Sequence, residues 1–110
     1  MDVIAYLLGH KAARGSVLIG ITAQPEDATV TVGARASFTV AALGANLAYQ
    51  WQYSSDDGET WANSGVASAV TATIKVTPNS MSLNGYKYRC VITSDGGTIT
   101  SNAATLTVTA

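Results

Sequence analysis

The feature that most constrains this chain is an alternation of apolar and polar residues that recurs along most of its length. Residues 36–40 read ASFTV and residues 104–108 read ATLTV, so apolar side chains occupy every second position. Successive side chains of a strand point to opposite faces, so this period predicts strands that bury one face. Glycine, proline and asparagine separate the runs and predict tight turns. The spacing predicts an all-β fold, an antiparallel β-sandwich of about seven or eight short strands.

Several strand boundaries can be placed from turn residues. A first strand is expected to open at residues 17–21, and Pro25 is expected to interrupt it at a sheet edge because proline has no N–H to donate. Residues 70–76 predict one strand, with Val70 beginning its apolar face. Residues 94–97, Ser-Asp-Gly-Gly, predict a hairpin turn.

The first residues have a helical instead of an alternating pattern. A short helix capped by Asp2 would place Ile4, Leu7 and Leu8 on one face, and an extended apolar segment is the alternative. The expected assembly contacts are Val3, Ile4, Leu7 and Leu8. The apolar run is far shorter than the roughly 20 residues of a membrane span, and it lacks the basic start of a secretion signal. We expect an attachment or assembly segment at residues 1–20, docked on its own domain or on another chain, and a sandwich domain at residues 21–110.

Composition argues against several classes of function. Charged residues make up 12% of the chain and the formal net charge is −1, so binding to nucleic acid has little electrostatic support. Cys90 is the single cysteine, which excludes an intrachain disulfide, and with His10 it cannot complete a zinc site. His10 is the single histidine and lies in the N-terminal segment, so no catalytic triad is expected. We expect no enzyme activity, no metal and no cofactor.

Two short motifs resemble those of immunoglobulin-like domains. The QWQ run at residues 50–52 and the YRC run at residues 88–90 carry the resemblance, which extends over residues 21–109. The phrases NGYKYRCVIT and SNAATLTV are similar to bacterial and bacteriophage domains of this kind more than to receptor or antibody domains. The fold implied is an immunoglobulin-like antiparallel sandwich.

The resemblance also implies roles for core residues. Trp51 would be the tryptophan buried between the sheets, and Cys90 would stand at the second cysteine of the usual disulfide. Tyr88 would be the tyrosine-corner residue, whose hydroxyl bonds back to the backbone. The first cysteine position falls on Val40, so Val40, Trp51 and Cys90 should simply pack together.

Residues 54–61, SSDDGETW, resemble a single Asp box, a hairpin motif of sialidase-like propellers. Local chemistry predicts that Asp56 accepts backbone N–H bonds, that Gly58 adopts a positive φ and that Trp61 covers the hairpin. Asp56 and Asp57 are sequence neighbours, so they cannot easily face each other across a cleft as the carboxylates of a glycosidase do. Turn chemistry is the main interpretation, and a weak metal or ligand site is the alternative.

Binding or assembly then remains as the expected role. The resemblance to bacteriophage proteins implies an accessory structural protein of the virion, of the decoration type. Its N-terminal segment would dock on other virion proteins or self-associate, and the sandwich would be displayed, with weak adhesion as a further role. The chain begins at Met1 and ends just after its last predicted strand, from which we expect a complete small protein.

The alternative is a carbohydrate- or cell-surface-binding module of a bacterial protein, located at the cell surface, and a third interpretation is an adhesin module of a longer chain. The candidate ligand surface is the outward sheet face with two loop tips: Gln50, Gln52, Asp56, Asp57, Trp61, Lys87, Arg89 and Asp95. The same residues would also suit an ordinary solvated sheet face. Surface glycans are the partners that this interpretation implies.

Overall fold

The structure is a computed structural model that describes residues 19–110. The expected assembly contacts Val3, Ile4, Leu7 and Leu8 lie outside the described residues, as does the helix or extended segment expected there.

Residues 19–110 form ten short strands and two 3₁₀ helices. The strands are β1 (Gly20–Ala23), β2 (Ala28–Thr31), β3 (Ala36–Thr39), β4 (Ala41–Leu43), β5 (Ala48–Ser54), β6 (Ala62–Asn63), β7 (Thr73–Val76), β8 (Lys87–Ser94), β9 (Gly97–Thr100) and β10 (Ala104–Thr109). The 3₁₀ helices are η2 (Ala67–Val70) and η3 (Met81–Leu83). Among the described residues no helix is long and apolar enough to cross a membrane.

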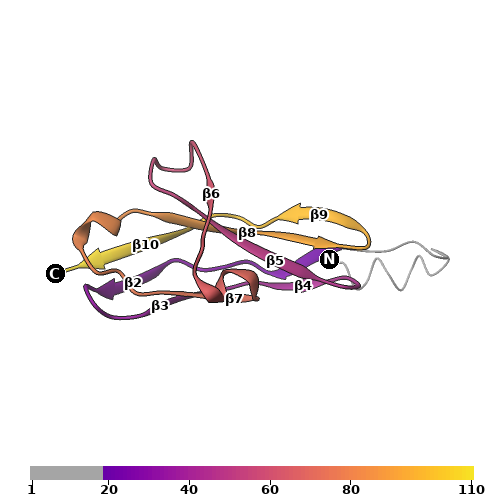
Figure 1. Ribbon diagram of the computed structural model, residues 1–110, viewed down its shortest axis with the longest axis horizontal. Helices are drawn as coiled ribbons and strands as arrows, with labels where there is room; N and C mark the ends of the chain where they lie inside the picture. The colour runs from indigo at the N-terminus through magenta and orange to yellow at the C-terminus, as the bar shows by residue number, and fades with distance from the viewer. Residues whose placement is uncertain (1–18) are drawn as a thin grey trace.

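The strands are arranged in two layers, which confirms the predicted β-sandwich. The larger sheet has the order β2-β10-β8-β5-β6, and β9 also pairs with β8. The pairs β3–β7 and β1–β4 make the second layer, and Figure 1 shows β3, β7 and β4 below β8 and β10. β3 and β4 follow each other directly along the chain through Val40. The second layer is therefore narrow, with β7 as an edge strand.

Among the described strands, one pair departs from the predicted antiparallel arrangement. β2 runs parallel to β10, from Ala28 opposite Leu106 to Thr31 opposite Thr109. The chain leaves β1 at the predicted Pro25 break and crosses to the other sheet. Side chains fasten the crossing, because Gln24 accepts a hydrogen bond from the Asn102 N–H and Asp27 accepts one from the Thr105 N–H, each at 2.8 Å.

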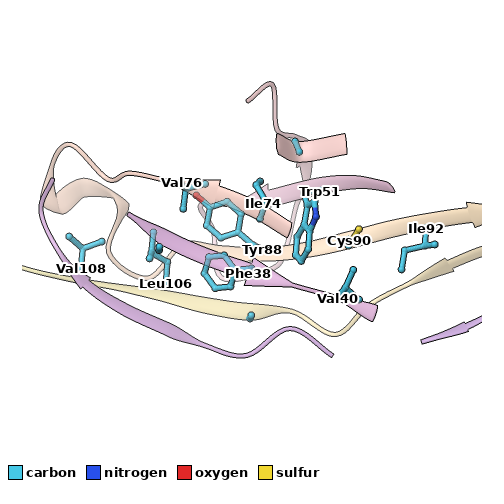
Figure 2. Packing of buried hydrophobic residues seen from close by; sticks show 13 residues of the cluster. Phe38, Val40, Trp51, Ile74, Val76, Tyr88, Cys90, Ile92, Leu106 and Val108 are labelled. Carbon is cyan, nitrogen blue, oxygen red and sulfur yellow. The ribbon is translucent and has the colours of Figure 1, made fainter. Parts of the chain in front are cut away.

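The core fills the space between the two layers. Trp51 is fully buried at its centre, and its indole Nε1 donates to the carbonyl oxygen of Thr71 at 2.8 Å. Val40 and Cys90 are also buried, and Figure 2 shows both near Trp51. Burial raises the pKa of the Cys90 thiol to about 11, so the thiol is neutral and unreactive at physiological pH. Apolar residues at every second position of β3, β8 and β10 supply most of the other core side chains.

The prediction of one strand over residues 70–76 was wrong at its start, because β7 begins at Thr73. Val70 is 60% exposed and lies in η2, and Ala69 takes the buried position instead. The cause is a local hydrogen-bond set that bends the chain against the edge of β7. The Ser68 hydroxyl accepts from the Lys75 N–H at 2.9 Å, and the Thr71 hydroxyl donates to the Ser68 carbonyl at 2.8 Å.

The tyrosine-corner bond implied for Tyr88 is also not formed within residues 19–110. Tyr88 is only 4% exposed, and its ring stacks on Phe38 with 5.0 Å between the centroids. Its hydroxyl is directed toward Val76 of the opposite layer (Figure 2) and away from its own strand. Asn84 provides a local bond instead, because its side-chain oxygen accepts from the Val108 N–H at 2.8 Å.

Candidate functional site

The SSDDGETW turn is held by its own side chains. Asp56 Oδ1 accepts from the Thr60 N–H at 2.9 Å and from the Ser54 hydroxyl at 2.7 Å. The Asp56 Oδ2 atom accepts from the Thr60 hydroxyl, and Ser54 Oγ also accepts from the Gly58 N–H at 2.8 Å. Gly58 has a φ of 90°, and the Trp61 indole donates to its carbonyl oxygen at 3.1 Å. The turn therefore has the geometry that local chemistry predicted.

These bonds account for the protonation behaviour of Asp56. Hydrogen bonds from the Thr60 side chain, the Ser54 side chain and the Thr60 backbone lower the pKa of Asp56 from 3.8 to about 2. Both carboxylate oxygens are thus occupied by bonds within the turn. Across residues 19–110 no three His, Cys, Asp or Glu side chains gather in a way that could hold a metal ion.

Trp61 connects the turn to the outer face of the larger sheet. The Arg89 guanidinium carbon lies 4.3 Å from the centroid of the Trp61 ring, a cation–π contact. Arg89 Nε also donates to Gln52 Oε1 at 2.9 Å, and Gln52 donates in turn to Asn63 Oδ1. The Lys87 ammonium lies 3.6 Å from a carboxylate oxygen of Asp57.

The structure thus brings together six of the eight residues of the predicted ligand surface, and it uses their polar groups internally. The six are Gln52, Asp56, Asp57, Trp61, Lys87 and Arg89. Gln50 lies on the same strand, and its amide donates to the carbonyl oxygens of Trp51 and Ser64. Asp95 lies apart from these residues. In the β5–β8 pairing, Ala48 lies opposite Thr93, close to Asp95, whereas Ser54 at the start of the SSDDGETW turn lies at the opposite end of β5. The Asp95 carboxylate accepts a hydrogen bond from the Asn46 side-chain amide.

A second site, which the sequence analysis did not predict, is a pocket between the two layers. Its volume is about 520 Å³. Three tyrosines line it, Tyr53, Tyr86 and Tyr88, and we call it the tyrosine pocket. The other lining residues are Ser64, Val66, Lys75, Val76, Thr77 and Leu83. The pocket therefore lies beside the edge strand β7, where the narrow second layer ends.

The tyrosines have distinct positions in the pocket. The rings of Tyr53 and Tyr86 are almost parallel, with 3° between their planes and 6.0 Å between their centroids, and both side chains are half-buried. The Tyr88 ring is buried in the core, and its hydroxyl takes part in no hydrogen bond within residues 19–110. Every fully buried side-chain N or O atom of those residues has a partner, so the Tyr88 hydroxyl is not fully enclosed by them, and Tyr88 lines the pocket.

The Tyr88 hydroxyl is a permanent donor. Burial, with smaller contributions from Tyr86 and Tyr53, raises its pKa to about 12, so it keeps its proton at physiological pH. The pocket thus offers two parallel aromatic rings and a protonated hydroxyl that has no protein partner among the described residues. Flat apolar surface combined with a few directed polar groups is typical of sites for small ligands.

The sequence pattern could not separate these tyrosines from the core. Tyr53 and Tyr86 fall on the inward face in the same alternation as Trp51 and Tyr88. Whether an inward residue is covered depends on the width of the opposite layer. The one available indication was the segment of small residues at 62–69, which supplies little apolar surface to cover the tyrosines.

The fold is shared with solved immunoglobulin domains. A structure of tandem titin immunoglobulin domains has a TM-score of 0.63 over 86% of this chain and 48% of that chain, at 19% identity. Sidekick-1 immunoglobulin domains 1–5 give 0.62 over 84% of this chain and 20% of that chain, at 23% identity. A titin M10–obscurin-like 1 complex gives 0.61 over 84% and 95%, at 19% identity. The protein is therefore an immunoglobulin-like β-sandwich domain, which confirms the resemblance seen in the QWQ and YRC motifs.

The chain belongs to the family described as a domain of unknown function, DUF8696, whose model matches residues 20–110. Endoglucanase C of Cellulomonas fimi is 36% identical over 89 residues, which make up 80% of this chain. The chain spans 8% of the length of that relative.

Proposed function

We propose that this immunoglobulin-like domain is a non-catalytic carbohydrate-binding module that acts at the bacterial cell surface and binds glycans in the tyrosine pocket. The observation that carries the proposal is the Tyr88 hydroxyl, a donor without a hydrogen-bond partner among residues 19–110, at a pocket that also holds the parallel rings of Tyr53 and Tyr86. This differs from the ligand surface predicted around Trp61 and Arg89, whose polar groups already bond to each other.

The chemistry of a sugar suits these groups. A pyranose ring has an apolar face of C–H groups, which loses contact with water when it packs flat on an aromatic ring. Its hydroxyl groups accept hydrogen bonds at fixed positions, and the Tyr88 hydroxyl at the pocket can donate to one of them. The two parallel, stacked rings of Tyr53 and Tyr86 offer a ligand aromatic surface from two side chains instead of one.

The relative supports the same class of ligand. Endoglucanase C is named for an activity on glucans, and the similar stretch is a small part of it. A module carried within such an enzyme has an evident use for carbohydrate affinity. This support concerns the ligand class, and the domain described here is proposed to bind without cleaving.

Binding to a glycan array, followed by titration calorimetry with the best oligosaccharide, tests the proposal. Tyr53→Leu and Tyr86→Leu keep an apolar side chain and remove the flat ring, and each should weaken binding about fivefold, because an aromatic contact contributes on the order of 1 kcal/mol beyond its buried area. Tyr88→Phe should weaken binding by removing the donor alone. Tyr49→Leu is the matched control, since Tyr49 is a half-buried tyrosine on β5 that does not line the pocket.

Two results would contradict the proposal. A blank array would remove carbohydrate binding altogether. Binding that is lost in Trp61→Ala and kept in the tyrosine variants would move the site to the outer face, where the sequence analysis had placed it.

The role of virion decoration is a separate proposal that depends on residues 1–20. The core of the described domain lies between Ala36 and Val108, so the sandwich should fold without the preceding segment. Deletion of residues 1–15 should then abolish self-association or binding to virion proteins and leave the unfolding transition in urea unchanged. Unaltered assembly by the shortened chain would overturn this role and would not affect the tyrosine pocket.

A further inference from the structure

The charge of the tyrosine pocket is one-sided. Among the described residues that line it, Lys75 is the one with a charged side chain, and none of them carries a carboxylate. The ion pair found within residues 19–110 joins Lys87 to Asp57 at the SSDDGETW turn, and Lys75 has no part in it. The described lining of the pocket therefore includes one cationic residue, exposed on the edge strand β7, and no carboxylate.

The strand that carries Lys75 is held in place. Ser68 Oγ accepts from the Lys75 N–H at 2.9 Å and lies 3.5 Å from the Lys75 carbonyl oxygen. This hydroxyl therefore pairs with the backbone groups of Lys75 that would otherwise face a neighbouring strand. On the other side, Lys75 pairs with Ser37 of β3. The backbone at Lys75 is thus held by hydrogen bonds on both sides of β7, beside the tyrosine pocket.

Resting on the proposed carbohydrate function, we infer that the tyrosine pocket selects an acidic saccharide, a glycan with hexuronate residues, whose carboxylate pairs with Lys75 while its ring packs on Tyr53 and Tyr86. The rings of Tyr53 and Tyr86 contact the apolar face of the sugar and do not distinguish a neutral sugar ring from an acidic one. The lysine does, because a carboxylate gains a charge partner there and meets no acidic side chain among the residues that line the pocket.

A matched pair of ligands tests the inference on the full chain. Cellotetraose and its fully C6-oxidised form, cellotetrauronic acid, differ in the exchange of each CH₂OH group for a carboxylate. Calorimetric titration at low and high salt should show tighter binding of the uronate, with the advantage shrinking as salt screens the pair. Lys75→Gln should reduce the affinity for the uronate about two- to fivefold, the range of a solvent-exposed ion pair, and leave that for cellotetraose unchanged.

Arg35→Gln is the matched control, because Arg35 is an exposed cation that does not line the pocket. Lys75→Arg should keep the preference for the uronate. Equal affinity for the two tetrasaccharides, or a preference that survives Lys75→Gln, would overturn the inference and leave carbohydrate binding standing. Failure of both tetrasaccharides and of every sugar on a broad array would instead overturn the proposed function, and the inference with it.

Discussion

Tyr88 stacks on Phe38 with 5.0 Å between the ring centroids and 22° between the ring planes. This contact joins β8 to β3 across the two layers and fixes the direction in which the Tyr88 hydroxyl leaves the core. The ring is therefore structural, and the hydroxyl has no hydrogen-bond partner among residues 19–110. The two parts of one side chain can be separated by mutation.

Tyr88→Phe should leave the free energy of unfolding within about 0.5 kcal/mol of the wild type, because it removes no hydrogen bond seen within residues 19–110. Tyr88→Ala should cost about 3–5 kcal/mol, since it empties an aromatic volume in the core. Urea unfolding followed by tryptophan fluorescence measures both values. A loss well above 1 kcal/mol in Tyr88→Phe would show that the hydroxyl has a protein partner after all.

Asp56 should make the stability of the domain depend on pH in the acid range. Its pKa is about 2 in the folded chain against an ordinary value of 3.8, so the unfolded chain takes up the proton first as the pH falls. The stabilisation is complete above about pH 4 and is lost as the pH falls through about 2. Wild type should have a higher urea midpoint than Asp56→Asn at pH 6, and the two midpoints should converge near pH 2.

Asp57→Asn is the control for this series, because Asp57 is an exposed neighbour outside the hydrogen bonds of the turn. It should show a smaller difference from wild type at pH 6. A gap between wild type and Asp56→Asn that stays constant from pH 6 to pH 2 would contradict the assignment.

Val40→Cys should form a disulfide with Cys90, because both residues are buried in the core near Trp51 (Figure 2) and occupy the positions that the immunoglobulin resemblance assigns to the disulfide. Closing a loop of this length should raise the free energy of unfolding by about 2–4 kcal/mol under oxidising conditions. Titration of thiols in denaturant should find none in the oxidised variant. Two titratable thiols after oxidation would show that the two Cβ atoms do not meet disulfide geometry.

Arg89 and Trp61 should be energetically coupled. A double-mutant cycle with Arg89→Ala and Trp61→Ala should give a coupling free energy of about 0.5–1 kcal/mol, the range of a cation–π contact at a partly exposed site. Arg35→Ala paired with Trp61→Ala serves as the reference cycle and should show strict additivity. Additivity in the Arg89 cycle as well would mean that the contact contributes nothing to stability.

The parts of the fold that the sequence predicted are those governed by local rules. The alternation in β3 and β10 placed Phe38 and Leu106 in the core, because successive side chains of a strand point to opposite faces. The SSDDGETW turn was equally predictable, since Ser54, Asp56 and Thr60 bond to each other within a few residues.

Other parts depended on contacts that the pattern does not encode. Val70 continues an apolar alternation, yet a single hydroxyl at Ser68 bends that segment into η2. Tyr53 and Tyr86 share the inward alternation of Trp51 and Tyr88, and the width of the second layer decides that they line a pocket. The reach of the opposite sheet is a long-range property, and so the candidate site could not be found from periodicity.

The parallel ladder between β2 and β10 also determines how the domain would carry a mechanical load. Its pairs run from Ala28 with Leu106 to Thr31 with Thr109. Suppose that β2 is pulled toward the start of the chain and β10 toward its end. The two forces act along the strands in opposite directions, so all hydrogen bonds between β2 and β10 are sheared at once. The antiparallel β8–β9 hairpin, pulled at its two ends, would open one pair after another. Tension along these strands therefore meets its resistance at the β2–β10 ladder, the one parallel pairing among the described strands.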